Sequence, residues 1–220
     1  MSAGHYRTPG ADVVPRGDGN EDSVHSVHCV HCVPGSRLGF LRLFKKKHRF
    51  TLFNYELMHS HVHLFLQPSP TILLGKTMHA IQRSFANDYN RRKKRQGHFW
   101  MNRYKSIPVE TDEHALTLMR YINRNAVRAG IALKPGGWKY SGYRFYAHGE
   151  PDDLLDPHPT YLGLAHDEEN RRTYYQRYVC QVLPEEDVRS PLLSEGRFIG
   201  SPAFGRKLGL ESGAGKGHST

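Results

Sequence analysis

His61 and His63 are separated by one residue within an aromatic and apolar run that predicts a β-strand. Because alternate residues of a strand point to the same face, their imidazoles would project side by side while Val62 points to the opposite layer. Neutral imidazoles are common ligands of divalent cations. The chain contains 15 histidines, however, so this spacing arises easily by chance and indicates a metal site only if a reactive partner lies nearby.

A candidate partner comes from the segment between Thr111 and Gly130, whose apolar residues recur at helical spacing. The stripe that this helix would bury contains Ala115, Leu118, Met119, Ile122, Ala126 and Ala129. Tyr121, Asn125 and Arg128 then share one flank of the stripe, with Tyr121 and Asn125 one turn apart. A tyrosine at such a flank can act as a nucleophile, or it can pack at the edge of a core.

The charge of the chain favours an anionic partner. Lysine and arginine number 31 against 21 acidic residues, a formal net charge of +10. The nucleic-acid contacts that we predict are Arg91, Arg92, Lys93, Lys94, Arg95, Arg103, Lys105 and Arg128, together with the segment Lys45–Arg49. Phe99, Trp100 and Tyr104 are interleaved with them and could stack on bases. A solvated basic surface with aromatic residues in the core is the alternative interpretation.

The composition also bears on location. No stretch approaches the roughly 18 apolar residues that a membrane span needs, and the first residues lack the apolar core of a signal peptide. The three cysteines, Cys29, Cys32 and Cys180, are too few for a disulfide framework. We therefore expect a protein of the cytoplasm without a membrane partner.

The order of the predicted elements indicates an α+β fold. Helices are expected over 36–47, from Leu74 toward Gly97, over 111–130 and over 167–183, and strands over 50–58, 61–66 and 107–109. This order predicts a ferredoxin-like antiparallel sheet with helices packed on it, given a first strand within residues 1–35, where Val13 and Val14 could start an edge strand. Residues 1–35 are otherwise poorly defined, 36–150 form the main domain, and 151–220 form a mainly helical extension with a disordered tip.

Four segments resemble a known family. They are LMHSHVHLFLQP (57–68), GHFWMNRYKSIPVE (97–110), RYINRNAVRAG (120–130) and WKYSGYRFY (138–146). Their order and spacing look like those of the REP-associated tyrosine transposases, bacterial single-tyrosine transposases of the IS200-like type, over about residues 36–150. These enzymes have an HUH motif, two histidines separated by one bulky apolar residue.

The resemblance implies roles for individual residues. His61 and His63 would bind a divalent metal, with Asn125 as a candidate third ligand. Mg²⁺ or Mn²⁺ fits a reaction of this type, although imidazole ligands alone would also suit Zn²⁺. Tyr121 would be the catalytic nucleophile that cleaves and rejoins single-stranded DNA through a 5′-phosphotyrosyl intermediate. The implied substrate is single-stranded DNA that carries a hairpin formed by a palindromic repeat.

The chain departs from the family pattern at three places. His59-Ser60 stand where the family usually has Pro-Asn, and Asn125-Ala126-Val127-Arg128 stand where it usually has Asn-Pro-Val-Arg. The N-terminal 35 residues match only faintly, around Arg16 and Gly17. Neither of the first two changes removes a catalytic group, whereas a missing first strand would weaken the sheet.

The sequence is compatible with two other functions. The fold could grip structured nucleic acid without catalysis. Alternatively, the crowded residues His25, His28, Cys29, His31 and Cys32 could bind zinc, although no second cysteine pair completes a site at familiar spacing. A His-rich arm without regular structure is the simpler interpretation of this segment. The sequence leaves the oligomeric state open.

Overall fold

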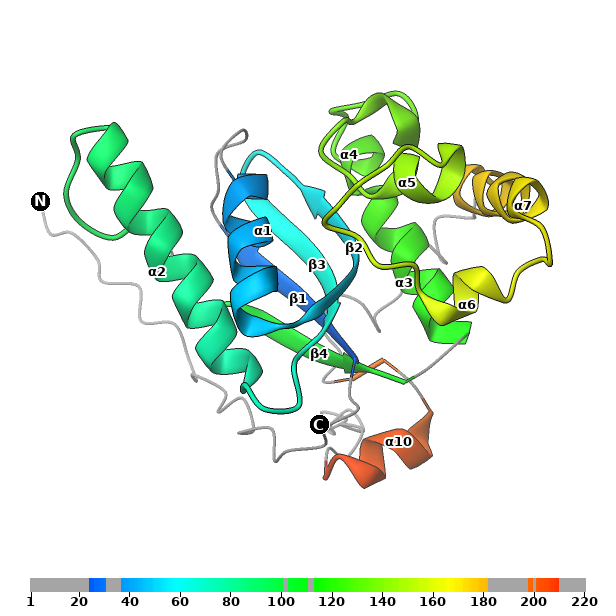
Figure 1. The fold of residues 1–220 in the computed structure, drawn as a ribbon, viewed down its shortest axis with the longest axis horizontal. Helices are drawn as coiled ribbons and strands as arrows, with labels where there is room; N and C mark the ends of the chain where they lie inside the picture. Colours follow the sequence, from blue (N-terminus) through cyan, green and yellow to red (C-terminus); the bar gives the residue numbers. More distant parts are fainter. Residues whose placement is uncertain are drawn as a thin grey trace, which may run out of the picture.

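The computed structural model describes residues 24–30 (backbone only), 37–100, 103–110, 113–181, 198–199 and 201–209. A four-stranded antiparallel sheet has the order β2-β3-β1-β4. Its strands are β1 (Val24–Val30), β2 (Thr51–Leu57), β3 (His61–Gln67) and β4 (Lys105–Val109). Helices pack on this small sheet, which confirms the predicted α+β class (Figure 1).

The first strand differs from the expectation. β1 comprises Val24–Val30 and pairs with both β3 and β4, so it lies inside the sheet and not at an edge. The segment that we interpreted as a His-rich arm is thus a strand, whereas Val13 and Val14 lie outside the described residues. Its valines recur at every third position, so the two-residue alternation typical of a half-buried strand is absent from the sequence.

One face of the sheet is covered by α1 (Arg37–His48) and α2 (Leu74–Arg92) (Figure 1). A small apolar cavity in this layer is lined by Leu41 of α1, Val62 and Leu64 of β3, and Met78 and Ile81 of α2, among others. Since strand residues alternate between faces, the odd-numbered residues of β3 point to the other layer. No helix in the described part of the chain is long and apolar enough to cross a membrane.

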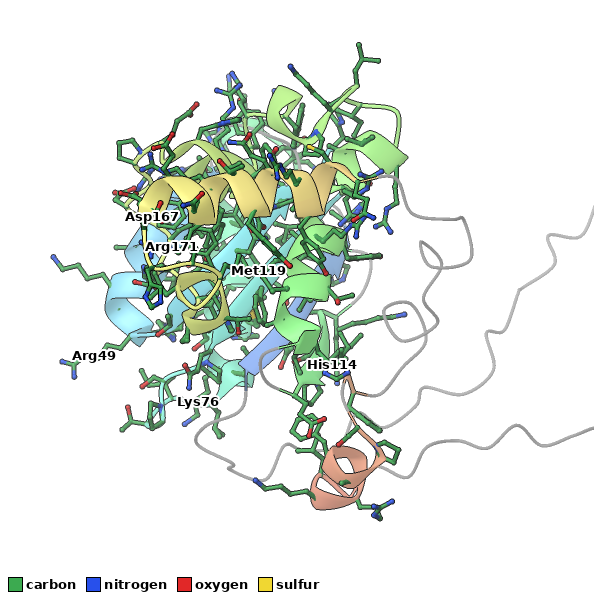
Figure 2. The ribbon with its side chains drawn as sticks, turned by 90° about the vertical axis from the view of Figure 1, so that its right-hand side faces the viewer. Arg49, Lys76, His114, Met119, Asp167 and Arg171 are labelled. Atoms are coloured by element: carbon green, nitrogen blue, oxygen red, sulfur yellow. The ribbon has the colours of Figure 1, made fainter. Side chains whose placement is uncertain are left out.

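The other layer contains the helices that follow β4 in the chain, up to residue 180. They are α3 (Glu113–Asn123), α4 (Asn125–Arg128), α5 (Tyr143–His148), α6 (Pro159–Leu162) and α7 (Glu168–Cys180), with a 3₁₀ turn, η1, at Pro135–Gly137. Tyr146, Tyr161 and Tyr175 pack their rings together, with centroids 4.7 to 5.6 Å apart. Figure 2 shows Met119 of α3 among the packed side chains, with α7 lying across this layer. The helical part after residue 150 therefore shares its core with the residues before it.

The helix that carries Tyr121 is broken in two, although the sequence predicted one helix to Gly130. α3 ends at Asn123 and α4 begins at Asn125. Five members of the predicted stripe are buried, namely Ala115, Leu118, Met119, Ile122 and Ala126. Ala129 is exposed and lies one residue beyond the end of α4. Gly130 has a φ of +67°, the left-handed conformation expected of a glycine that ends a helix.

Residues near the C-terminus return to the sheet. Ile199 lies beside Val109 of β4 in a parallel bridge, and its carbonyl accepts from the Glu110 N–H at 2.6 Å. The short helix α10 (Pro202–Lys207) follows, capped by the Ser201 hydroxyl. We did not predict this helix, because six residues are too few to show a helical period. The tip over residues 210–220 lies outside the described residues.

Gly142, at the start of α5, donates its N–H to the Tyr55 carbonyl of β2 at 2.9 Å and has no room for a side chain. A Cβ atom there would lie 2.3 Å from Asn54 Oδ1, and Asn54 is fully buried. Gly142→Ala should therefore lower the free energy of unfolding by about 1–3 kcal/mol, the usual cost of overpacking. Urea denaturation would measure the change.

Gly39→Ala is the matched control for Gly142→Ala. Gly39 lies inside α1 with nothing within 4 Å of its Cβ position. The same substitution there should stabilise the protein, by up to about 1 kcal/mol, through helix propensity alone. Equal effects of the two substitutions would contradict the packing described around Asn54.

Candidate active site

The two candidate metal ligands open strand β3. The ring centroids of His61 and His63 are 4.8 Å apart, in an edge-to-face arrangement. The Ser60 hydroxyl lies 3.0 Å from His61 Nδ1 and orients this ring, as outer partners do for metal-binding histidines. His63 is buried, whereas His61 is partly exposed. The predicted side-by-side placement is therefore confirmed.

Tyr121 lies beside the histidine pair. The centroids of the His63 and Tyr121 rings are 5.9 Å apart. The Arg128 guanidinium carbon is 3.9 Å from the centre of the Tyr121 ring, a cation–π contact. Residues from β3, α3 and α4 thus meet around the tyrosine that the sequence singled out.

Asn125 is buried next to this cluster, but its amide already has partners. Its Nδ2 atom donates to the carbonyls of Tyr121 at 3.1 Å and Ile122 at 3.2 Å. Its Oδ1 atom accepts from the Arg128 guanidinium. A metal that used Asn125 as a ligand would have to share or replace this contact with Arg128.

The residues present are compatible with a loosely held divalent cation. Two adjacent imidazoles and one amide oxygen supply three ligands without a negative charge, leaving positions for phosphate oxygens. Within the described residues, no group of three or more His, Cys, Asp or Glu side chains is arranged to hold a metal ion. The zinc alternative falls on residues 25–32, whose side chains lie outside that description.

Glu56 belongs to the same cluster and was missed by the sequence analysis. It pairs with His63 across the β2–β3 ladder, and its side chain is fully buried. Its carboxyl accepts a hydrogen bond of 2.5 Å from the Ala126 N–H. Burial raises the pKa of Glu56 to about 8, even though this bond and the charge of Arg128 act in the opposite direction.

Ser141 extends this contact into a buried polar network. Its hydroxyl oxygen lies 3.3 Å from Glu56 Oε2 and 3.2 Å from Asn123 Oδ1. A hydroxyl has only one proton to donate, so a protonated Glu56 can donate to Ser141 while Ser141 donates to Asn123. Asn123 in turn donates to the Tyr175 hydroxyl at 2.7 Å. The network connects the strand opposite His63 to α3 and α7.

The predicted nucleic-acid residues have different environments. Residues 91–95 are exposed at the end of α2, where Asp88 pairs with Arg91 at 3.0 Å and Arg92 at 2.7 Å. Arg103 and Lys105 are also exposed. Lys45 instead pairs with Asp156 at 2.7 Å, an internal role.

The predicted stacking residues are partly committed to packing. Phe99 and Trp100 contact Phe85, and the Trp100 indole N–H donates to the Gln82 carbonyl at 2.8 Å. Tyr104 is half-buried. α2 covers the face opposite to that of His63, so the basic end of this helix and the histidine pair belong to different layers.

Comparison with known proteins identifies the domain that holds this cluster. Residues 38–125 match the model of a family described as "Transposase IS200 like". The chain carries an IS200-like transposase domain. The matched part of the transposase domain contains His61, His63 and Tyr121 and ends at Asn125.

A solved structure is also similar to the chain. It is described as a REP-associated tyrosine transposase bound to a REP hairpin, with 14% sequence identity and a TM-score of 0.49. The similarity covers 70% of this chain and 94% of that one. No curated protein matches the chain.

Glu56 should make stability depend on pH. Because its pKa rises from an ordinary 4.5 to about 8 on folding, the folded protein keeps a proton that the unfolded chain loses between these values. The free energy of unfolding should therefore fall as pH rises through this window, by up to about 1.4 kcal/mol per pH unit. Glu56→Gln, which does not titrate, should remove this component. Urea denaturation of both proteins at pH 5 and pH 8 measures the difference.

Ala126→Pro tests the same contact from the other partner. Proline is tolerated in the first turn of a helix but lacks the N–H that donates to the Glu56 carboxyl. The substitution should therefore lower the free energy of unfolding by about 1–3 kcal/mol. The cost should shrink in a Glu56→Ala background, where no buried carboxyl loses its donor. Additive effects would show that the contact contributes nothing to stability.

Proposed function

We propose that this protein is a metal-dependent transposase or strand transferase that cleaves and rejoins single-stranded DNA through a 5′-phosphotyrosyl intermediate on Tyr121. The observation that carries the proposal is the packing of Tyr121 against His63, with ring centroids 5.9 Å apart, beside His61 in a segment that matches an IS200-like transposase. The candidate nucleophile on α3 and the candidate metal ligands on β3 come from separate elements and lie side by side, which supports the proposal.

In this reaction, the Tyr121 phenol oxygen attacks the phosphorus of a phosphodiester and loses its proton. The bond between phosphorus and the 3′ oxygen breaks, and the 3′ oxygen leaves as a hydroxyl after gaining a proton. The new bond keeps the energy of a phosphodiester, so a free 3′-hydroxyl can attack it and release Tyr121, which joins strands without ATP. Arg128, stacked on the Tyr121 ring, places a positive charge near the phosphate that approaches.

His61 and His63 are the residues that would hold the metal, with Asn125 as the third ligand. We assign Mg²⁺ or Mn²⁺, which suit phosphate oxygens. When bound, the cation withdraws charge from a nonbridging oxygen and makes attack on an anion easier. Asn125 can take part once Arg128 turns from its amide oxygen toward DNA.

We also assign the sheet and its first two helices to the ferredoxin-like architecture. The element order β1-α1-β2-β3-α2-β4 and the strand order β2-β3-β1-β4 support this assignment. In this architecture β1 and β3 are neighbours in the middle of the sheet. The histidine pair therefore lies on an interior strand, where pairing on both sides holds it in place.

The substrate that we propose is single-stranded DNA with a hairpin, as the family resemblance implies, in the bacterial cytoplasm. The exposed basic residues at 91–95, with Arg103 and Lys105, would contact its phosphates. We assign such cutting to transposition or recombination of DNA, as the family resemblance implies.

Tyr121→Phe should bind hairpin-bearing single-stranded DNA about as tightly as the original protein while forming no covalent adduct, because only the nucleophilic oxygen is lost. A denaturing gel with labelled DNA and Mn²⁺ shows the adduct. Tyr89→Phe and Tyr104→Phe are the matched controls and should still form it. Adduct formation by Tyr121→Phe would move the nucleophile elsewhere, and its absence from every variant would favour a non-catalytic binding protein.

Replacing Arg91, Arg92, Lys93, Lys94 and Arg95 by glutamine should weaken DNA binding and flatten its dependence on salt, since each lost phosphate contact releases fewer counterions. Fluorescence anisotropy at several salt concentrations gives the slope. Arg206→Gln with Lys207→Gln, in α10, is the control for position: it removes two positive charges elsewhere, to be compared with Arg91→Gln with Arg92→Gln, which removes two within the segment. A slope equal to that of the control would leave residues 91–95 as a solvated helix end.

A further inference from the structure

Three aromatic side chains form a continuous group beside the histidine pair. The ring centroids of His59 and Trp138 are 5.4 Å apart, and those of Trp138 and Tyr140 are also 5.4 Å apart. His59 is exposed, and Trp138 and Tyr140 are half-buried, so part of this aromatic surface faces solvent. We call these three residues the aromatic platform.

Hydrogen bonds attach the aromatic platform to the end of β2. The Trp138 indole N–H donates to the Leu57 carbonyl at 3.0 Å, and the Leu57 N–H donates to the Tyr140 carbonyl at 2.9 Å. Ser141 forms an antiparallel bridge with Glu56. The segment that carries Trp138 and Tyr140 therefore runs along the free edge of β2, next to the turn that leads into His61.

The position of the platform relates it to the proposed reaction. His59 precedes His61 by two residues in the turn between β2 and β3, so their Cα atoms lie within about 7 Å, the span of two residues in fully extended chain. A base that lies on the platform would thus belong to one of the nucleotides next to a phosphate held at the histidine pair.

The charge around the platform favours DNA as the occupant. The Lys139 ammonium lies 4.9 Å from the centre of the Tyr140 ring, where it can also meet a phosphate. The formal net charge of the chain is +10. A row of aromatic rings flanked by a cation is the arrangement with which proteins bind single strands, with bases on the rings and phosphates on the cations.

We propose that the aromatic platform of His59, Trp138 and Tyr140 is a stacking site for one unpaired nucleobase beside the cleaved phosphate. This proposal rests on the proposed function, because it takes the histidine pair as the place of that phosphate. The platform would position the single strand so that the phosphodiester lies against Tyr121. It reads the presence of an unpaired base more than its identity, since every base has a π-face.

The test combines Trp138→Leu with DNA in which single bases are removed. Binding is measured by anisotropy in the Tyr121→Phe background, where DNA is not cut, using hairpin DNA with an abasic site at each successive position of the single-stranded flank. Trp138→Leu should weaken binding of intact DNA by about 5- to 100-fold, the usual effect of losing one stacked base. One abasic position should weaken binding to the protein that retains Trp138 by a similar factor. At that position, the two losses together should cost no more than about either alone.

Two further variants separate stacking from structural damage. Trp138→Phe loses the indole N–H but keeps an aromatic face, so it should bind close to normally and keep its sensitivity to the abasic position. His59→Ala leaves the indole hydrogen bond intact and should show a smaller coupling at the same or the next nucleotide. Hairpin DNA without a single-stranded flank should bind equally to the protein with Trp138 and to the Trp138→Leu variant.

The proposal is overturned if Trp138→Leu binds DNA as tightly as the protein that retains Trp138. It is overturned as well if, at every abasic position, the fold-loss in affinity of the combination equals the product of the two separate fold-losses. It is also overturned if Trp138→Phe is as damaged as Trp138→Leu. Cleavage of the same DNA by the protein with Tyr121 intact reports separately on the proposed reaction. Coupling without cleavage would uphold the platform and contradict the proposed chemistry, whereas cleavage without coupling would do the reverse.

Discussion

The relative placement of the two halves of the site depends on one buried hydrogen bond, from the Ala126 N–H to the Glu56 carboxyl. A carboxyl without a partner in this environment would cost several kcal/mol, so the bond fixes where α4 begins relative to β2. Glu56 pairs with His63, and α4 follows α3, which carries Tyr121. One contact therefore sets the distance between histidine and tyrosine, although neither residue takes part in it.

The helices after residue 150 support the same arrangement from outside. Arg120 donates to the Gln181 carbonyl and Arg124 donates to the Val179 carbonyl at 2.8 Å, so two cations meet the C-terminal end of α7. This placement is favourable for the helix dipole as well as for the unpaired carbonyls. Because both arginines flank Tyr121 in sequence, α7 restrains the helix of the nucleophile, and the C-terminal part of the chain is a support for the site.

The sequence predicted those features that repeat with a regular period or depend on neighbours in the chain. The alternation of β3 and the buried stripe of α3 are of this kind, and they suffice to place His61, His63 and Tyr121. The sequence did not predict β1, because its valines do not alternate, nor α10, because it is short. It did not predict the role of Glu56 for another reason. Its burial and its partners come from residues 70 and 85 positions away, which no local pattern reveals.

The two local departures from the family pattern turn out to have physical uses in this chain. Where the family usually has proline after the asparagine, Ala126 supplies the N–H that Glu56 accepts, a donor that proline cannot offer. Where the family usually has proline before the first histidine, His59 adds a ring to Trp138. Each change removes a rigid proline and adds a specific contact near the site, a backbone hydrogen bond at Ala126 and a ring contact at His59. The buried Glu56 carboxyl is stabilised by the Ala126 N–H, which a proline at residue 126 would remove, so the two positions have to be considered together.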